Sequence, residues 1–345
     1  SAMQELEYQR HGAPARSTSA KRKVIFAVAF ALVAVGVVTA VVLTRPHHHS
    51  SDDDVATDAS ACVGCNCFQG LGWTPRSNSD LLGKHTWHPK PGTSGPTTHG
   101  PKPNTPQCPS KAALVDPATL PSSFDAREQW PGWMQPVLNE GECGSAWSNA
   151  IPVAVSDRMA IAQGKNVDLI SRGYMLLCTP NSQPPCDHDG DFRAAWASIT
   201  EAPGIPSAEC FPWDPTYPGC PTQCANGSAI TTRYHGKGYE WIAGEGAMMQ
   251  SIMTEGPLTT VLTLHMPAFD CYSSGIYTNG KLKVDDFHVA VIIGWGEENG
   301  VKYWTVQNDF GTNWGEQGYI RVLRGVDEAS IEWGRYGYCA VAAKF

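Results

Sequence analysis

The stretch Asn-Glu-Gly-Glu-Cys-Gly-Ser-Ala-Trp-Ser at residues 139–148 decides the fold. It leads into residues 145–163, which we predict to form a helix. A helix start favours a thiolate, because the helix dipole stabilises negative charge there. Acyl-transfer chemistry at such a thiolate also needs a histidine, a residue that orients it, and uncharged donors for the oxyanion.

The later part of the chain is rich in alternating or continuously apolar, β-branched segments. We predict strands at residues 257–264, 287–296, 301–308 and 317–324. A helical first half followed by a β-rich second half predicts an α+β fold with two subdomains.

Four motifs in order resemble the papain family of cysteine proteases, and cathepsin B within it. Leu120-Pro-Ser-Ser-Phe-Asp-Ala-Arg127 resembles the mature start of cathepsin B, and residues 139–148 resemble the segment around the family's nucleophile. Residues 286–296, with the sequence DFHVAVIIGWG, are similar to the strand that carries the family's histidine. Residues 303–320, with the sequence YWTVQNDFGTNWGEQGYI, are similar to the strand and loop that carry its asparagine.

The resemblance implies a papain-like domain over residues 120–345, with a helical left subdomain and a β-barrel-like right subdomain. It assigns the role of base to His288 and the role of orienting residue to Asn308. It also implies a substrate groove to which four residues belong: Asp189, Gly190, Phe310 and Gly334. No cofactor and no metal ion are expected at this site.

Several positions depart from the family pattern. Ala146 stands at the position of the nucleophile, and a methyl group cannot attack a carbonyl. The adjacent Ser145 points about 100° away on a helix, so we do not expect it to take over. Glu140 stands at the oxyanion glutamine, where an ionised carboxylate would repel the developing charge. Asp309 replaces the family's usual serine, and Phe310 replaces a tryptophan.

Two functions compete. The first is a non-catalytic pseudopeptidase that binds polypeptide or scaffolds a complex, including as a subunit of a membrane assembly. The alternative is an active lumenal or lysosomal cysteine endopeptidase, represented here by a Cys-to-Ala variant. Glu140 favours the first, as does the lack of zymogen-like amphipathic helices in residues 46–119.

The twelve cysteines indicate disulfides and an oxidising compartment. The resemblance implies three pairs: Cys143–Cys186, Cys178–Cys220 and Cys210–Cys224. It leaves Cys271 and Cys339, which we expect to pair with each other. The short segment between Cys210 and Cys220 contains no histidine, so an intact relative would be an endopeptidase rather than a dipeptide-releasing enzyme.

Residues 24–43 form an uncharged apolar run long enough to cross the roughly 30 Å core of a bilayer. Basic residues at 21–23 precede it and acidic residues at 52–54 follow, which predicts a cytoplasmic tail at 1–23 and a lumenal or extracellular remainder. We therefore predict a type II signal anchor. Cleavage as a signal peptide, near residues 38–40, is the alternative.

Residues 44–119 are rich in Pro, Gly and Ser and predict a stalk. Four cysteines lie in it: Cys62, Cys65, Cys67 and Cys108. Two local disulfides are the favoured use, and a metal site with His85 and His88 is the alternative. Asn226 begins a glycosylation sequon, and the net charge of −8 argues against nucleic acid as a partner.

Overall fold

The computed structural model describes residues 65–77, 115–180, 186, 191–201, 203–284, 286–333 and 339–345. All of them belong to one unit, residues 53–345. The predicted tail, the predicted anchor at 24–43 and most of the predicted stalk lie outside the described residues. In the part of the chain that is described, every helix is too short or too polar to cross a membrane.

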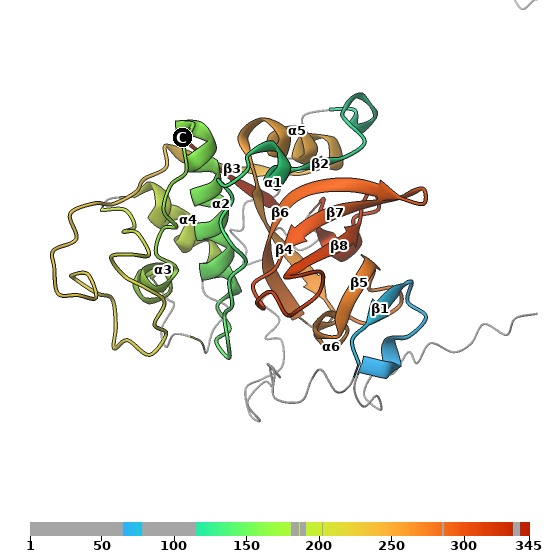
Figure 1. Cartoon of the computed structure of the whole chain (residues 1–345), viewed down its shortest axis with the longest axis horizontal. Helices are drawn as coiled ribbons and strands as arrows, with labels where there is room; N and C mark the ends of the chain where they lie inside the picture. Colours follow the sequence, from blue (N-terminus) through green and yellow to red (C-terminus); the bar gives the residue numbers. More distant parts are fainter. Residues whose placement is uncertain are drawn as a thin grey trace, which may run out of the picture. The chain divides into compact units, whose positions relative to one another are not determined.

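The helix α2 (Ala146–Gln163) is the predicted helix, and its buried residues run without a break from Trp147 to Ala160. It ends at Gly164, whose left-handed conformation (φ 66°) suits glycine. Helices α3 (Arg172–Cys178) and α4 (Phe192–Thr200) pack beside it. Its apolar side chains form one core with Trp196 of α4. This is the predicted helical subdomain, at the left of Figure 1.

The second subdomain is a strongly curved sheet. Its strands are β1 (Trp73–Pro75), β5 (Tyr272–Tyr277), β8 (Tyr319–Leu323), β7 (Val301–Gln307), β6 (Asp286–Glu298), β4 (Leu258–Leu264), β9 (Ala340–Lys344) and β3 (Gly238–Ile242), in the order of their pairing. The pair β5–β8 is parallel and the other pairs are antiparallel. The four strands predicted from the sequence are confirmed as β4, β6, β7 and β8.

The remaining helices and one short strand lie around the sheet. They are η2 (Cys65–Phe68), η4 (Pro117–Thr119), β2 (Phe124–Asp125), α1 (Ala126–Gln129), α5 (Glu245–Glu255), α6 (Met266–Asp270) and η5 (Glu328–Ser330). The short strand β2 pairs with β6. A third core of small and β-branched side chains, including Ala150 and Val153 of α2 and Val291 and Ile293 of β6, joins helix to sheet. The predicted two-subdomain α+β fold is confirmed.

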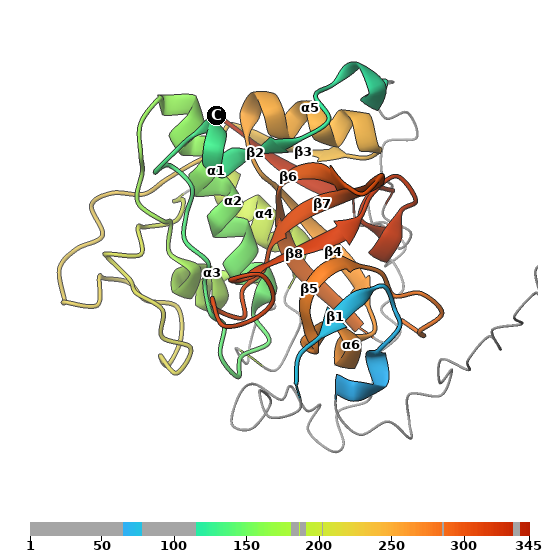
Figure 2. The ribbon, with the colours of Figure 1, turned by 45° about the vertical axis from the view of Figure 1, so that its right-hand side comes forward.

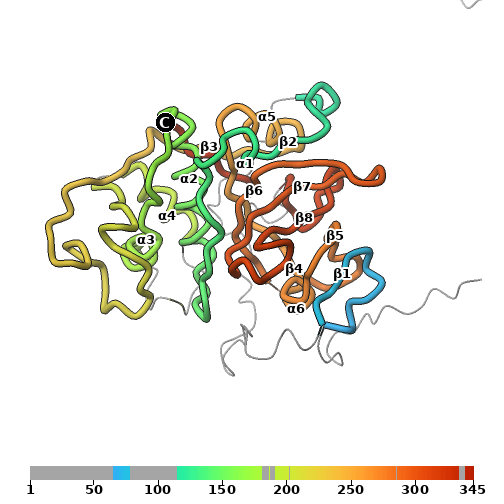
Figure 3. Tube along the Cα trace, viewed as in Figure 1, coloured from blue at the N-terminus to red at the C-terminus, as the bar shows by residue number. Residues whose placement is uncertain are grey.

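Disulfides hold the long loops of the helical subdomain. The three predicted pairs, Cys143–Cys186, Cys178–Cys220 and Cys210–Cys224, are all present. The last two fasten the extended segment 203–237, which forms the outer edge of this subdomain in Figure 3. Asn226 is exposed in this segment, and its glycosylation remains a prediction.

Residues 65–77, predicted as stalk, are part of the folded domain. The strand β1 adds to the edge of the sheet beside β5, where Trp73 lies opposite Gly275 (Figure 2). Cys65 is bonded to Cys271. The predicted Cys271–Cys339 pair is therefore wrong, as is a purely local pairing for Cys65, while Cys339 is itself disulfide-bonded.

The physical reason for this correction is the burial of two aromatic side chains. Trp73 is only 5% exposed and Phe68 only 4%. The ring of Trp73 lies 5.3 Å from that of Tyr277 and 5.9 Å from that of Tyr272. Two buried aromatic residues in a Pro/Gly-rich segment give no periodicity, so the sequence pattern did not reveal them.

We predict that Trp73→Ala lowers the free energy of unfolding by about 3–5 kcal/mol, because it empties a fully packed aromatic site. Trp333→Ala is the matched control, since Trp333 is 53% exposed, and should change stability by less than about 0.5 kcal/mol. Denaturant unfolding followed by circular dichroism measures both. Equal stability of the two variants would show that residues 65–77 are a dispensable stalk.

Candidate active site

The start of α2 carries no nucleophile. Ala146 is the first residue of the helix. Its neighbour Ser145 is completely buried, and its hydroxyl donates to the carbonyl of Cys143 at 3.2 Å. Ser145 therefore cannot reach a substrate in place of the missing thiol, as the helix geometry predicted.

Two predicted site residues, His288 on β6 and Asn308 after β7, are brought together. The Nε2 atom of His288 donates to Oδ1 of Asn308 at 2.6 Å. Both side chains are buried, at 4% and 2% exposure. The rings of Phe269 and Phe310 lie 5.3 and 5.0 Å from the imidazole ring. Phe310 thus provides apolar cover over the imidazole of His288.

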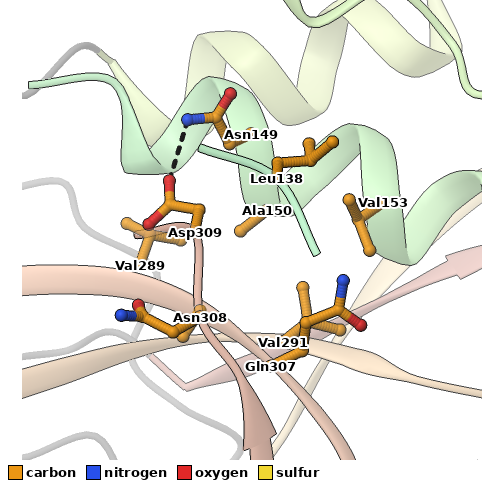
Figure 4. Close-up of a pocket in the computed structure, with 10 residues that line it drawn as sticks. Leu138, Asn149, Ala150, Val153, Val289, Val291, Gln307, Asn308 and Asp309 are labelled. Atoms are coloured by element: carbon orange, nitrogen blue, oxygen red, sulfur yellow. Dashed lines mark hydrogen bonds between the residues drawn. The ribbon is translucent and has the colours of Figure 1, made fainter. Parts of the chain in front are cut away.

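A carboxylate that sequence reasoning gave no role, that of Asp309, also reaches the imidazole. Its Oδ1 atom lies 3.4 Å from Nε2 of His288, and its Oδ2 atom accepts from the amide of Asn149 at 2.8 Å (Figure 4). Asn149 was missed as well. Its position three residues after Ala146 on the same face of a helix is the signal that could have identified it.

Glu140 lies against the start of α2. Its backbone N–H donates to the carbonyl of Asp309 at 2.9 Å. One carboxyl oxygen, Oε2, accepts from the backbone N–H of Ser145 at 2.7 Å and lies 3.4 Å from the Ser145 hydroxyl. The carboxyl group therefore occupies the N-terminal end of the helix, where backbone N–H groups are free.

The protonation of Glu140 and of His288 depends on burial and on the neighbouring Asp309. Burial raises the pKa of Glu140, the charge of Asp309 raises it further, and the pKa lies well above the usual range. Burial alone would lower the pKa of His288, but the carboxyl group of Asp309, 3.4 Å from the ring nitrogen, raises it to about 9. At neutral pH the imidazole of His288 is therefore protonated, and the raised pKa of Glu140 favours the neutral form of its carboxyl group.

This burial bears on the expectation that Glu140 is an ionised carboxylate that repels an oxyanion. Burial and the charge of Asp309 both favour the neutral form of its carboxyl group. A neutral acid repels negative charge less than a carboxylate does, so Ala146 in place of a thiol is the stronger of the two departures.

A small cavity lies between α2 and β6, behind the His288–Asn308 pair (Figure 4). Its volume of about 10 Å³ suits one water molecule and excludes a substrate. Two of the polar atoms on its lining residues, Nδ2 of Asn308 and Oδ1 of Asp309, are buried without a hydrogen-bond partner in the described structure. Asp189, Gly190 and Gly334, predicted along the groove, lie outside the described residues.

Comparison with known proteins identifies relatives for most of the domain. The family model described as papain family cysteine protease matches residues 120–342. Cathepsin B-like CP3 of Giardia intestinalis is 33% identical over 204 residues, which are 57% of this chain and 67% of that protein. Cathepsin B of Dictyostelium discoideum is 29% identical over 231 residues, covering 61% and 72%.

Solved structures agree with this. The structure of proCathepsin B S9 from Trypanosoma congolense has a TM-score of 0.60 at 27% identity, and the match covers 65% of this chain and 77% of that one. The bromelain protease of Ananas comosus, solved in complex with the E64 inhibitor, has a TM-score of 0.54 at 27% identity. That match covers 66% of this chain and all of the other.

We predict that the pKa of His288, about 9 in the folded protein, falls to 6.5 or below in Asp309→Asn. The amide removes the negative charge while burial still disfavours the imidazolium. NMR titration of the imidazole C–H signals measures this, with His288→Gln to assign the signal. Glu297→Gln, which neutralises an exposed acid at the end of β6, should leave the titration unchanged.

The same shift has a consequence for stability. Because the pKa is raised on folding, the imidazolium adds stability that is fully present below pH 6.5 and is lost as the pH rises through about 9. The full shift corresponds to about 3 kcal/mol. An unfolding free energy as pH-dependent between 6.5 and 9 in Asp309→Asn as in the parent chain would contradict this account.

Proposed function

The chain belongs to the papain family of cysteine proteases, and from this we propose that it is a catalytically inactive member that binds polypeptide without cleaving it. The observation that carries the proposal is Ala146 at the first position of α2 in a chain that keeps a His288–Asn308 pair bonded at 2.6 Å. The orienting groups for a thiolate are present and the thiol itself is absent.

Asp309 gives the imidazole of His288 a negative partner. It raises the pKa of His288 to about 9, so at neutral pH the ring carries the proton. In the family mechanism the thiolate would be the negative partner of this imidazolium. Here Asp309 takes that electrostatic place, at 3.4 Å, without being able to form an acyl intermediate.

A polypeptide ligand is the second half of the proposal. Papain-like proteases bind extended polypeptides, and the fold that does so is retained over residues 120–342. The chain has a net charge of −8, which disfavours nucleic acid. Loss of the nucleophile removes bond cleavage, but it does not by itself remove the surfaces that contact a substrate.

The cellular setting is also part of the proposal. The four disulfides between described cysteines suit an oxidising compartment. Together with the apolar run at 24–43, they support a type II membrane protein whose folded domain faces a lumen or the exterior. A role as a subunit of a membrane complex is compatible with this arrangement.

We predict that Ala146→Cys alone hydrolyses fluorogenic peptides at least about 100-fold more slowly than the triple variant Ala146→Cys/Glu140→Gln/Asp309→Ser. The triple variant restores the family's residue at all three positions, including an oxyanion donor worth about 10²–10³ in rate. Initial rates measure the difference, and thiol labelling by an epoxide inhibitor reports whether the new cysteine is reactive.

A single reversion that is as fast as the triple variant would contradict the proposal. It would favour the alternative function, an active endopeptidase that lacks only its cysteine. The chain with Ala146 intact is the baseline for both measurements.

We also predict that the parent chain binds a fluorescein-labelled unfolded polypeptide saturably and releases it intact. Fluorescence polarisation measures the binding, and mass spectrometry of the recovered polypeptide measures cleavage. The heat-unfolded chain is the control. If no binding occurs at up to about 1 mM protein, a range that includes affinities as weak as about −4 kcal/mol, the polypeptide-binding half of the proposal fails.

A further inference from the structure

Three side chains meet at the vacated nucleophile position. A ring nitrogen of His288 and one carboxyl oxygen each from Glu140 and Asp309 lie within 4.8 Å of one another. The three residues come from separate segments: the loop before α2, the strand β6 and the turn after β7. The imidazole and the carboxyl group of Asp309 are in direct contact, with 3.4 Å between Nε2 of His288 and Oδ1 of Asp309.

Each of the three side chains is oriented by a separate hydrogen bond. Asn308 accepts from Nε2 of His288, so the lone pair of a neutral ring lies on Nδ1. The amide of Asn149 donates to Oδ2 of Asp309, and the backbone N–H of Ser145 donates to Oε2 of Glu140. Metal-binding imidazoles and carboxylates are typically held in this way by a second layer of hydrogen bonds.

Asp309 and Glu140 each have a second carboxyl oxygen that these hydrogen bonds do not use. Oδ1 of Asp309 is buried and has no hydrogen-bond partner among the residues that the structure describes, in a side chain only 5% exposed. Oε1 of Glu140 makes no hydrogen bond in the same part of the chain. These two oxygens and the imidazole form a set of three donors around one point.

A divalent cation would take the place of the protons that the set holds. Two carboxyl groups this close ordinarily share a proton or a positive ion. The guanidinium of Arg172 does not bridge them, because it donates to the carbonyl of Asn139 and the side-chain oxygen of Asn149. A doubly charged ion would balance both carboxylates at once.

We propose that Glu140, His288 and Asp309 form a binding site for a divalent metal ion of the zinc class. One imidazole nitrogen and two carboxylate oxygens are a common three-ligand set for Zn²⁺, with a fourth position open to water or a ligand atom. Glu140 is half-buried, which leaves the site a path to solvent. The three ligand atoms now lie at most 4.8 Å apart, and around a tetrahedral ion they would lie about 3.3 Å apart.

Binding would also join the two subdomains. The ion would link the loop that begins α2 to the strands that carry His288 and Asp309, so it stabilises the folded state by mass action. This inference is independent of peptide binding and of hydrolysis, so either proposal can fail without the other.

The test is zinc binding to the full chain, measured by isothermal titration with zinc chloride. Because the chain also contains three consecutive histidines at 47–49, all variants carry His→Gln at these positions. We expect one zinc equivalent, weakened at least tenfold by His288→Gln and by Asp309→Asn. His235→Gln, which removes an exposed histidine, is the matched control and should bind like the parent.

Thermal unfolding without zinc shows whether each variant is folded, and zinc should raise the melting temperature of the parent and of His235→Gln only. Equal zinc binding by the parent and both site variants would overturn the proposal. A second measurement does not depend on any variant. In crystals of the parent chain soaked with zinc, anomalous scattering between the three side chains supports the site, and a peak elsewhere or none refutes it.

Discussion

The burial of α2 on nearly all sides is the constraint on which the rest of the structure depends. A helix without a solvent-exposed face needs hydrogen-bond partners within the protein for its polar side chains. Arg158 meets this requirement by donating to the carbonyls of Ala343 and Gly256. Asp157 accepts from the backbone N–H of Gln135 at 2.7 Å, and burial raises its pKa well above the usual range. The helix is thereby fixed to the strands behind it and to the loop that precedes it.

The same constraint fixes the site. Because burial and these hydrogen bonds hold α2 in place, they also fix the positions of Ala146 and Asn149 in its first turn relative to β6 and β7. The hydrogen bond from Asn149 to Asp309 then aims the Asp309 carboxylate at His288. The result is a pair of acids, Glu140 and Asp309, beside the imidazole of His288 at the start of the helix.

The main elements could be predicted because their patterns are long and local. The helix α2, the strands β4, β6, β7 and β8, and three disulfides all follow from such patterns or from the resemblance they support. Residues 65–77 could not be predicted, because their place depends on two aromatic side chains and one long-range disulfide. The contact of Asp309 with His288 and the raised pKa of Glu140 depend on burial and on distances between segments, which no local pattern contains.

The Cys65–Cys271 bond also determines how the domain would respond to a mechanical pull. The bond gives tension between the chain upstream of Cys65 and the C-terminal end a covalent path that passes directly to Cys271. Residues 66–270, which include β1 and the whole of α2, then lie outside the covalent path that carries the tension. An upstream tether could be stretched while the helix at the centre of the fold stays unloaded.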